Sequence, residues 1–442
     1  MRRRLLSILL LITVTIFFVT GCSSKSKSET SAGDASASKE SSAAGEEAVD
    51  TGASTETTLT MKSDAAAPEE APMKSSETSD SLDMVEPMEP AHNQQNTAGL
   101  LTAGEWNDHN HWTFFTNLIA NQQLMIPSFG MNPTNRIMVT VLNQEGSPVE
   151  NARVNLLDSA QEVIWEATSD NNGIAYVFFH VWNNNQIPSS LSISKNGSFT
   201  SADLVFTTVN SEQNSNNQTK TQSYQDATVT INDDPSTRSL DLMFVFDTTG
   251  SMSDELSYLQ TEFEDIAKKV SDQNTRYSVN FYRDEGDEYV IRSNEFASDI
   301  EVVLTQLKQE AADGGGDYPE AVDQALNDAI YDHAWNLESV KLLFLILDAP
   351  PHSQDAQVND SLRKSVAEAA KQGIRIIPVA SSGVDKDTET FLRTIAILTG
   401  GTYTFLTDHS GIGNSHLEPT IGDYEVENLN DCIVRIIKTY YQ

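Results

Sequence analysis

The stretch from Leu240 to Ser253 places an apolar segment directly before a polar turn and a helical pattern. Leu240 to Phe246 reads LDLMFVF, and an apolar run of this length predicts a strand buried on both faces of a sheet. The apolar residues that follow recur every three or four positions, as on one face of an amphipathic helix. They are Met252, Leu256, Leu259, Phe263, Ile266 and Val270. A buried strand that enters a helix through a short turn is half of a βαβ unit, and such sheets bind ligands at the carboxyl ends of their strands.

The turn between this strand and helix carries oxygen donors at alternate positions. Asp247, Thr249 and Ser251 supply one carboxylate and two hydroxyls. Hard oxygen donors suit Mg²⁺, and hydroxyls bind the ion without cancelling its charge, so that it still attracts an outside carboxylate. A phosphate-binding loop would need a Lys before Ser251, and a nucleophile elbow would need a different glycine spacing. The alternative interpretation of the turn is a capped helix start without metal.

Strands and helices alternate from this point to the last residue. Predicted strands cover residues 240–246, 277–282, 340–347, 375–380 and 402–406, with a short edge strand at 289–291. Predicted helices cover residues 252–270, 300–307, 321–329, 359–372, 386–398 and 424–437. This alternation predicts an α/β domain over residues 236–442, with an open, doubly wound, mostly parallel sheet and helices on both faces.

The turn Asp247-Thr248-Thr249-Gly250-Ser251 resembles the D-x-[ST]-x-S signature of the metal-ion-dependent adhesion site in von Willebrand factor type A (VWA) domains. The resemblance extends in order over residues 239–442. It implies a Rossmann-like sheet that binds Mg²⁺, with Mn²⁺ or Ca²⁺ as alternatives, at the carboxyl ends of its strands. It further implies recognition of a protein ligand, through a carboxylate of that ligand.

The family completes its metal site from two later loops. Asp348 follows the most apolar strand of the chain and matches the third-loop Asp of the family. The second loop, GGGDYPE at residues 314–320, departs from the Thr of adhesive members and is similar to the loop of extracellular-matrix and bacterial members. Asp317 is the predicted ligand there, with Glu320 as the alternative. The predicted metal set is therefore Asp247, Thr249, Ser251, Asp317 and Asp348.

The N-terminus predicts export and lipidation. Arg2 to Arg4 precede the apolar run Leu5 to Val19, which is shorter than the roughly 20 residues of a spanning helix and indicates a secretory signal. Val19-Thr20-Gly21-Cys22 resembles the bacterial lipobox, which implies that Cys22 becomes the lipidated mature N-terminus. We therefore expect residues 1–22 to be a lipoprotein signal peptide and the mature chain to be anchored, outside the cytoplasm, to a bacterial cell membrane.

Composition separates the next two regions and limits the partners. Residues 23–98 are rich in Ser, Ala, Glu and Pro and contain almost no aromatic residues, which predicts a disordered stalk. Residues 99–130 contain several aromatic residues and predict a segment that docks on the folded part. The formal net charge of −36 argues against nucleic acid and anionic membrane surfaces as partners, and it favours cations or basic protein patches.

Residues 131–235 change to a period of two, with turn residues at regular intervals. This pattern predicts a small antiparallel β-sandwich followed by a polar linker at residues 210–226. The run resembles bacterial immunoglobulin-like or carboxypeptidase-regulatory-like modules.

The sequence predicts a binding or adhesion protein rather than an enzyme. A metal-dependent hydrolase that uses the same carboxylates with His352 is one alternative, although the sequence supplies no complete nucleophile, base and orienting group. A metal-free structural module is the other alternative.

Overall fold

The computed structural model describes residues 99–125, 129–182, 184–211, 219–233, 238–270 and 274–441. The predicted signal peptide with Cys22 and the predicted stalk lie outside these ranges. Within them, no helix has both the length and the apolar character needed to cross a membrane.

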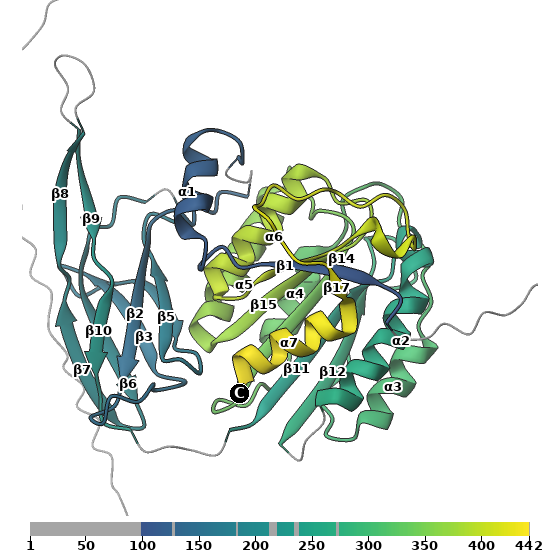
Figure 1. Ribbon diagram of the computed structural model, residues 1–442, viewed down its shortest axis with the longest axis horizontal. Helices are drawn as coiled ribbons and strands as arrows, with labels where there is room; N and C mark the ends of the chain where they lie inside the picture. Colours follow the sequence, from purple (N-terminus) through teal and green to yellow (C-terminus); the bar gives the residue numbers. More distant parts are fainter. Residues whose placement is uncertain are drawn as a thin grey trace, which may run out of the picture. The chain divides into compact units, whose positions relative to one another are not determined.

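The C-terminal region is built on one eight-stranded sheet (Figure 1). In spatial order its strands are β13 (Ile291–Arg292), β12 (Thr275–Tyr282), β11 (Leu240–Asp247), β14 (Val340–Leu347), β15 (Ile374–Ala380), β16 (Tyr403–Leu406), β1 (Thr102–Trp106) and β17 (Glu427–Asn428). The five strands from β12 to β16 run parallel, and the remaining pairings are antiparallel. The predicted mixed α/β region with a mostly parallel sheet is confirmed.

Two apolar cores lie on opposite faces of this sheet. One core contains side chains of α2 (Ser253–Val270), α3 (Ile300–Gln309) and α7 (Leu429–Tyr441). The other contains side chains of α4 (Val322–Tyr331), α5 (Ala356–Gln372) and α6 (Lys386–Thr399). Strand β11 supplies both cores, because successive side chains of a strand point to opposite faces: Phe244 and Phe246 enter the first, and Val245 enters the second. Cys432 of α7 is buried in the first core as a free thiol.

The region expected to be an aromatic docking segment begins instead with a strand of the large sheet. Strand β1 pairs antiparallel with β16, from Ala103 opposite Leu406 to Trp106 opposite Tyr403. The helix α1 (Trp112–Ala120) follows and buries Phe115. Local periodicity did not reveal β1, because its strand partner lies about 300 residues away and its short run TAGEW contains a glycine. That glycine, Gly104, has a packing reason, since a Cβ there would lie 2.5 Å from the ring of Phe405.

Two small sheets are formed by strands between Arg136 and Thr230. One has the order β10 (Ala227–Thr230), β2 (Arg136–Leu142), β5 (Ile174–Phe178). The other has the order β4 (Val163–Thr168), β3 (Arg153–Asp158), β6 (Pro188–Lys195), β7 (Ser198–Asp203). The pairings among β2 to β7 are antiparallel, as expected, and β10 adds a parallel pairing with β2. Part of the expected linker is also a strand, since β8 (Phe206–Ser211) and β9 (Thr219–Tyr224) form a hairpin.

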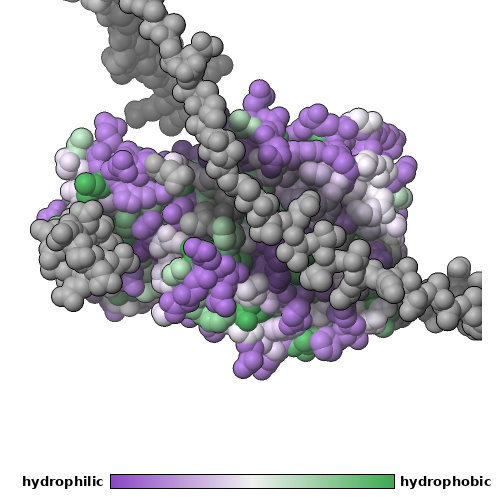
Figure 2. All heavy atoms as spheres, turned by 90° about the horizontal axis from the view of Figure 1, so that it is seen from above, coloured by the Kyte–Doolittle hydropathy of each residue, from purple (hydrophilic) through white to green (hydrophobic). Residues whose placement is uncertain are grey.

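Hydrogen bonds join the smaller sheets to the C-terminal region. The Thr168 hydroxyl donates to the carbonyl of Lys371 at 2.8 Å, and Arg375 donates to the carbonyl of Thr168 at 2.6 Å. In the view of Figure 2, the described residues are mostly hydrophilic, and hydrophobic ones form small separate patches. A face of this kind is typical of a solvated surface rather than of a broad apolar interface.

Candidate functional site

The carboxyl ends of β11 and β14 lie side by side at one edge of the large sheet. The two strands are parallel neighbours, paired from Leu240 opposite Val340 to Phe246 opposite Ile346. Asp247 ends β11, and Asp348 directly follows β14, so both carboxylates lie at this edge. Both are buried, with exposed fractions of 0% for Asp247 and 4% for Asp348. We call this place the metal edge, defined by Asp247, Thr249, Ser251, Glu320 and Asp348.

The first loop brings its three oxygen-bearing side chains together. The Thr249 backbone N–H and hydroxyl both donate to Asp247 Oδ1, at 2.9 and 2.7 Å. The Thr249 hydroxyl also lies 3.1 Å from the Ser251 hydroxyl. A short 3₁₀ turn, Gly250–Met252, then leads into α2. The structure thus places the predicted carboxylate and the two predicted hydroxyls in one continuous set of contacts.

Burial and nearby carboxylates raise the pKa of both aspartates. Burial is the main cause of the raised pKa of Asp247, and the hydrogen bonds from Thr249 only partly oppose it. Burial also raises the pKa of Asp348, and the neighbouring carboxylates of Asp247 and Glu255 raise it further, while Ser251 opposes the change. Buried carboxylates that lie close to one another disfavour the charged form, which a cation between them would favour.

The second loop contributes Glu320 to this edge rather than Asp317. Asp317 is exposed, and no hydrogen bond or ion pair is found for it in the described part of the chain. Glu320 is 3% exposed, and burial together with Asp247, Asp284 and Asp348 raises its pKa to about 9. Its backbone N–H donates to the carbonyl of Pro350 at 2.9 Å, which attaches the second loop to the third.

The glycine run allows the second loop to approach the first closely. The Gly250 N–H donates to the Gly314 carbonyl at 3.1 Å. Gly315 has a φ of +76°, and a Cβ there would lie 3.3 Å from both Glu320 Oε1 and Thr249 Cβ. A side chain at residue 315 would therefore separate the two loops, which gives a physical reason for glycine at this place.

Buried oxygen atoms without hydrogen-bond partners show whether a cation would fit the metal edge. Within the described ranges, Asp247 Oδ2, Glu320 Oε2 and Asp348 Oδ1 are buried without a hydrogen-bond partner. Tyr282 lies close enough to Asp247 to lower its pKa, yet its hydroxyl also lacks a partner of hydrogen-bond geometry. Buried anionic oxygens without partners are costly, and a divalent cation would satisfy them. The donor set therefore fits Mg²⁺ in chemistry.

His, Cys, Asp and Glu alone do not complete a metal site here. In the parts of the chain that the structure describes, no group of three or more such side chains is arranged to hold an ion. The hydroxyls of Thr249 and Ser251 would have to join the carboxylates. For the first loop, the sequence predicted such a mixture of one carboxylate and two hydroxyls.

His352 lies in a neighbouring cavity rather than among these oxygens. Its Nε2 atom is 3.0 Å from Asp284 Oδ1, and both residues line a cavity of about 540 Å³ together with Asp323 and Asp355. Asp287 borders the second loop, because its carboxylate accepts from the Gly315 N–H at 2.8 Å.

Sequence reasoning missed Glu255, which lies near Asp348. Glu255 is fully buried on α2, and its Oε1 atom is 3.0 Å from His416 Nε2. Its spacing held a signal, because residue 255 stands three positions after Met252 and four before Leu259, on the apolar face of the helix. A carboxylate on that face indicates a buried polar role.

Comparisons with known proteins agree with the fold at this site. The family model described as "von Willebrand factor A domain" matches residues 241–412, the span that contains the metal edge. A "Putative ariadne-like RING finger protein R811" of Acanthamoeba polyphaga mimivirus is 33% identical over 118 residues, which are 26% of this chain and 11% of the viral protein. The chain thus spans about a tenth of that curated relative.

A solved structure gives a further similarity. The crystal structure of the conserved hypothetical protein BatB from Bacteroides thetaiotaomicron covers 46% of this chain and 98% of its own, with 12% sequence identity and a TM-score of 0.33. The family match rests on residues 241–412 alone, and VWA domains are generally protein-interaction modules.

Proposed function

From a VWA-type domain at residues 241–412, we propose that this protein binds a protein partner through a divalent cation, Mg²⁺ in the first place, held at the metal edge. The observation that carries the proposal is the trio of buried, unpartnered oxygens of Asp247, Glu320 and Asp348. A cation there would compensate negative charge that no basic group among their pKa-shifting neighbours offsets.

The chain's own residues would hold the ion as follows. Asp247 and Asp348 would supply charged oxygens from the ends of β11 and β14, and Thr249 and Ser251 would supply neutral ones. Glu320 replaces Asp317 as the proposed second-loop residue. When bound, the ion would offer a positive site for a carboxylate of the partner, because the hydroxyl donors leave part of its charge uncancelled.

A binding role accounts for the site better than metal-assisted hydrolysis. The hydrolase alternative needs His352 as an acid or base beside the ion, whereas His352 contacts Asp284 in the neighbouring cavity. We expect the wild type to show no metal-dependent hydrolysis. Variants at the metal edge should lose partner binding.

Membrane attachment through a lipid on Cys22 is the second part of the proposal, and it rests on the sequence alone. The residues between Cys22 and Gly99 would then give the folded part reach beyond the lipid surface. Replacing Cys22 by Ser should move the protein from the membrane fraction to the soluble extracytoplasmic fraction. Unchanged membrane association of this variant would contradict the anchor.

Calorimetric titration with Mg²⁺ tests the metal site directly. Wild-type protein should bind one ion per chain, and Asp247→Asn should abolish the heat of binding. Asp241→Asn is the matched control, because Asp241 is equally buried on the same strand but pairs with Arg276, whose Nε atom donates to it at 2.8 Å. It should lose stability yet keep its affinity for Mg²⁺. A wild-type protein without Mg²⁺, Mn²⁺ or Ca²⁺ binding would leave the metal-free structural module as the better interpretation.

Partner capture tests whether the protein recognises its partner through the ion. The immobilised wild-type domain should retain a protein from an envelope extract in Mg²⁺ and release it in EDTA, and Asp247→Asn should retain none. Capture that is equal in Mg²⁺ and EDTA would contradict recognition through the ion.

A further inference from the structure

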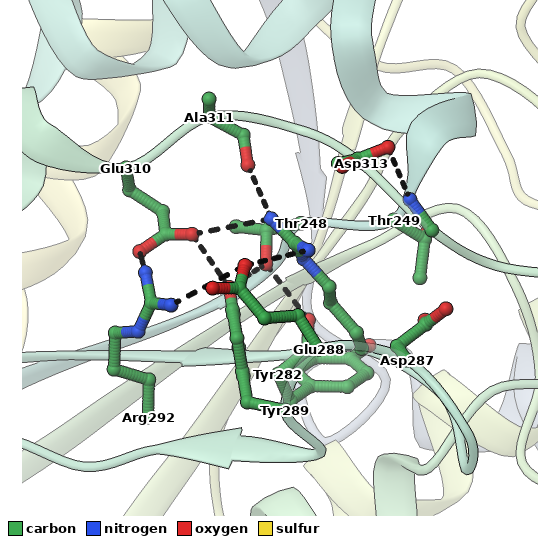
Figure 3. A network of polar contacts seen from close by, with 12 residues as sticks. Thr248, Thr249, Tyr282, Asp287, Glu288, Tyr289, Arg292, Glu310, Ala311 and Asp313 are labelled. Atoms are coloured by element: carbon green, nitrogen blue, oxygen red, sulfur yellow. Dashed lines mark hydrogen bonds and ion pairs between the residues drawn. The ribbon is translucent and has the colours of Figure 1, made fainter.

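A polar network surrounds Thr248, the residue between two of the proposed metal-binding residues (Figure 3). Thr248 is fully buried, and its backbone N–H donates to the carbonyl of Tyr282 at 3.0 Å. Its carbonyl accepts from the Asp313 N–H at 3.1 Å, next to the glycine run of the second loop. Thr248 therefore connects the first loop with the end of β12 and with the second loop.

The side chain of Thr248 makes a further contact with Tyr289. The two hydroxyls are 2.7 Å apart, and the Tyr289 hydroxyl also donates to Glu310 Oε1 at 2.6 Å. A phenol has one hydrogen to donate. Glu310 takes that hydrogen, and the single hydrogen of the Thr248 hydroxyl is shared between the Tyr289 oxygen and the Tyr282 carbonyl, which lies 3.0 Å from it.

Charged groups hold Tyr289 and Glu310 in place. Arg292 Nη1 donates to Glu310 Oε2 at 2.5 Å, and the Glu310 side chain is only 2% exposed. The guanidinium carbons of Arg283 and Arg292 lie 4.5 and 4.0 Å from the centre of the Tyr289 ring. The ring is thus stabilised by cation–π contacts as well as by its hydroxyl, and its position is restricted from several sides.

We propose that Tyr289 is a positioning residue for the metal edge and that it acts through Thr248 without touching the ion. This inference rests on the proposed metal site. Asp247 and Thr249 flank Thr248 in the chain, so a displacement of Thr248 moves both of their oxygen donors relative to Glu320 and Asp348. Sites of this kind tolerate displacements of about 0.5 Å, and supporting hydrogen bonds maintain that accuracy.

Tyr289→Phe removes the hydroxyl and keeps the ring with its contacts to Arg283 and Arg292. We expect its dissociation constant for Mg²⁺, measured by calorimetry, to rise 5-fold or more. Tyr440→Phe is the matched control, because the Tyr440 hydroxyl is also buried and donates to the carbonyl of Gly400 at 3.1 Å, far along the chain from the metal edge. Its melting temperature in EDTA should fall, and its Mg²⁺ affinity should stay within 2-fold of wild type.

A double-mutant cycle separates positioning from general destabilisation. Thr248→Val should weaken Mg²⁺ binding as Tyr289→Phe does. The double variant should lose less affinity than the two single losses combined, because both substitutions remove the contact that the two hydroxyls share, although each also removes one further hydrogen bond. If Tyr289→Phe fails to fold, Thr248→Val alone carries the test with the same 5-fold threshold. If Tyr289→Phe, or Thr248→Val in its place, binds Mg²⁺ with an affinity within 2-fold of wild type, the role of Tyr289 is overturned and the proposed function stays intact. Absence of Mg²⁺ binding by the wild type overturns both.

Discussion

Two groups of buried carboxylates in the C-terminal region have opposite electrostatic states. At the first, which we call the arginine centre, Arg393 donates to both oxygens of Asp108, at 2.7 and 2.9 Å, and to Glu389 at 3.2 Å. Glu389 further accepts from the Thr420 N–H at 2.7 Å and pairs with Lys386 at 3.0 Å. At the metal edge, Asp247, Glu320 and Asp348 each keep a buried oxygen without a partner among the described residues.

The two groups differ in whether the protein itself supplies positive charge for its buried carboxylates. Arg393, Asp108 and Glu389 have side chains at most 2% exposed, and the protein itself provides the compensating charge. The carboxylates of the metal edge are as deeply buried, yet no basic group lies among the described neighbours that shift their pKa values. A complete ion cluster of the first kind stabilises or specifies the fold, whereas an incomplete one is typical of a functional site.

The largest expected effect is on the arginine centre. Arg393→Met keeps the volume of the side chain but leaves Asp108 and Glu389 buried without their cation, so the free energy of unfolding should fall by about 3–5 kcal/mol. Urea unfolding in EDTA measures this loss. Arg435→Met is the control, because that side chain is 48% exposed in its pairs with Glu105 and Glu427 and should cost at most about 1 kcal/mol. Equal losses in the two variants would remove the distinction between the centres.

At the metal edge, removal of one charged group should leave the free energy of unfolding unchanged or raise it. Asp348→Asn removes one of the repelling charges, so in EDTA the variant should be as stable as wild type or more stable. In Mg²⁺ at about 100 times its dissociation constant, wild type should gain about 2.7 kcal/mol and the variant almost nothing. Thermal unfolding with and without Mg²⁺ provides both numbers. A variant that is strongly destabilised in EDTA would show that Asp348 belongs to the fold rather than to an ion.

A smaller, pH-dependent effect belongs to His109, the neighbour of Asp108. Its Nε2 donates to the carbonyl of Ile397 and its Nδ1 accepts from Arg136, both at 2.9 Å. Burial and the Arg136 charge lower the pKa of His109 well below 6.5, so it stays neutral in the folded protein. Below about pH 6.5 the unfolded chain binds a proton that the folded chain does not, and stability falls.

The matched variant for this effect is His109→Gln, which is neutral at every pH. Relative to that variant, wild type should lose up to about 1.4 kcal/mol per pH unit below pH 6.5. Urea unfolding at pH 7.5, 6.5 and 5.5 measures the difference. If the difference in free energy of unfolding between wild type and His109→Gln is the same at all three pH values, folded His109 binds a proton as readily as the unfolded chain does.

Local patterns predicted the parts of the fold and site that depend on short stretches of sequence. The strand, turn and helix around Asp247 and the strand before Asp348 follow from hydrophobic periodicity, and the edge where they meet follows from parallel pairing. Contacts between distant segments could not be found in this way. Arg393 and Asp108 are 285 residues apart, and β1 lies about 300 residues from its partner β16.

The second loop shows the same limit within seven residues. The sequence predicted Asp317 as the ligand, with Glu320 as the alternative. The conformation of a loop with three consecutive glycines is not fixed by local preference, so the sequence could not show which side chain is buried. The structure separates them through a contact with another loop, the hydrogen bond from the Glu320 N–H to Pro350.

The smallest expected effect therefore concerns Asp317. Because its side chain is exposed and Glu320 takes the place beside Asp247, Asp317→Asn should change the Mg²⁺ affinity by less than about 3-fold, through long-range charge that salt screens. Glu320→Gln, tested in parallel, should weaken Mg²⁺ binding by 10-fold or more, because Gln has no proton to release to the solvent and cannot become the anionic oxygen that the ion would hold. Calorimetry at 0.15 M salt compares the two substitutions. The reverse ranking would make Asp317 the second-loop ligand, and it would mean that the loop rearranges when the ion binds.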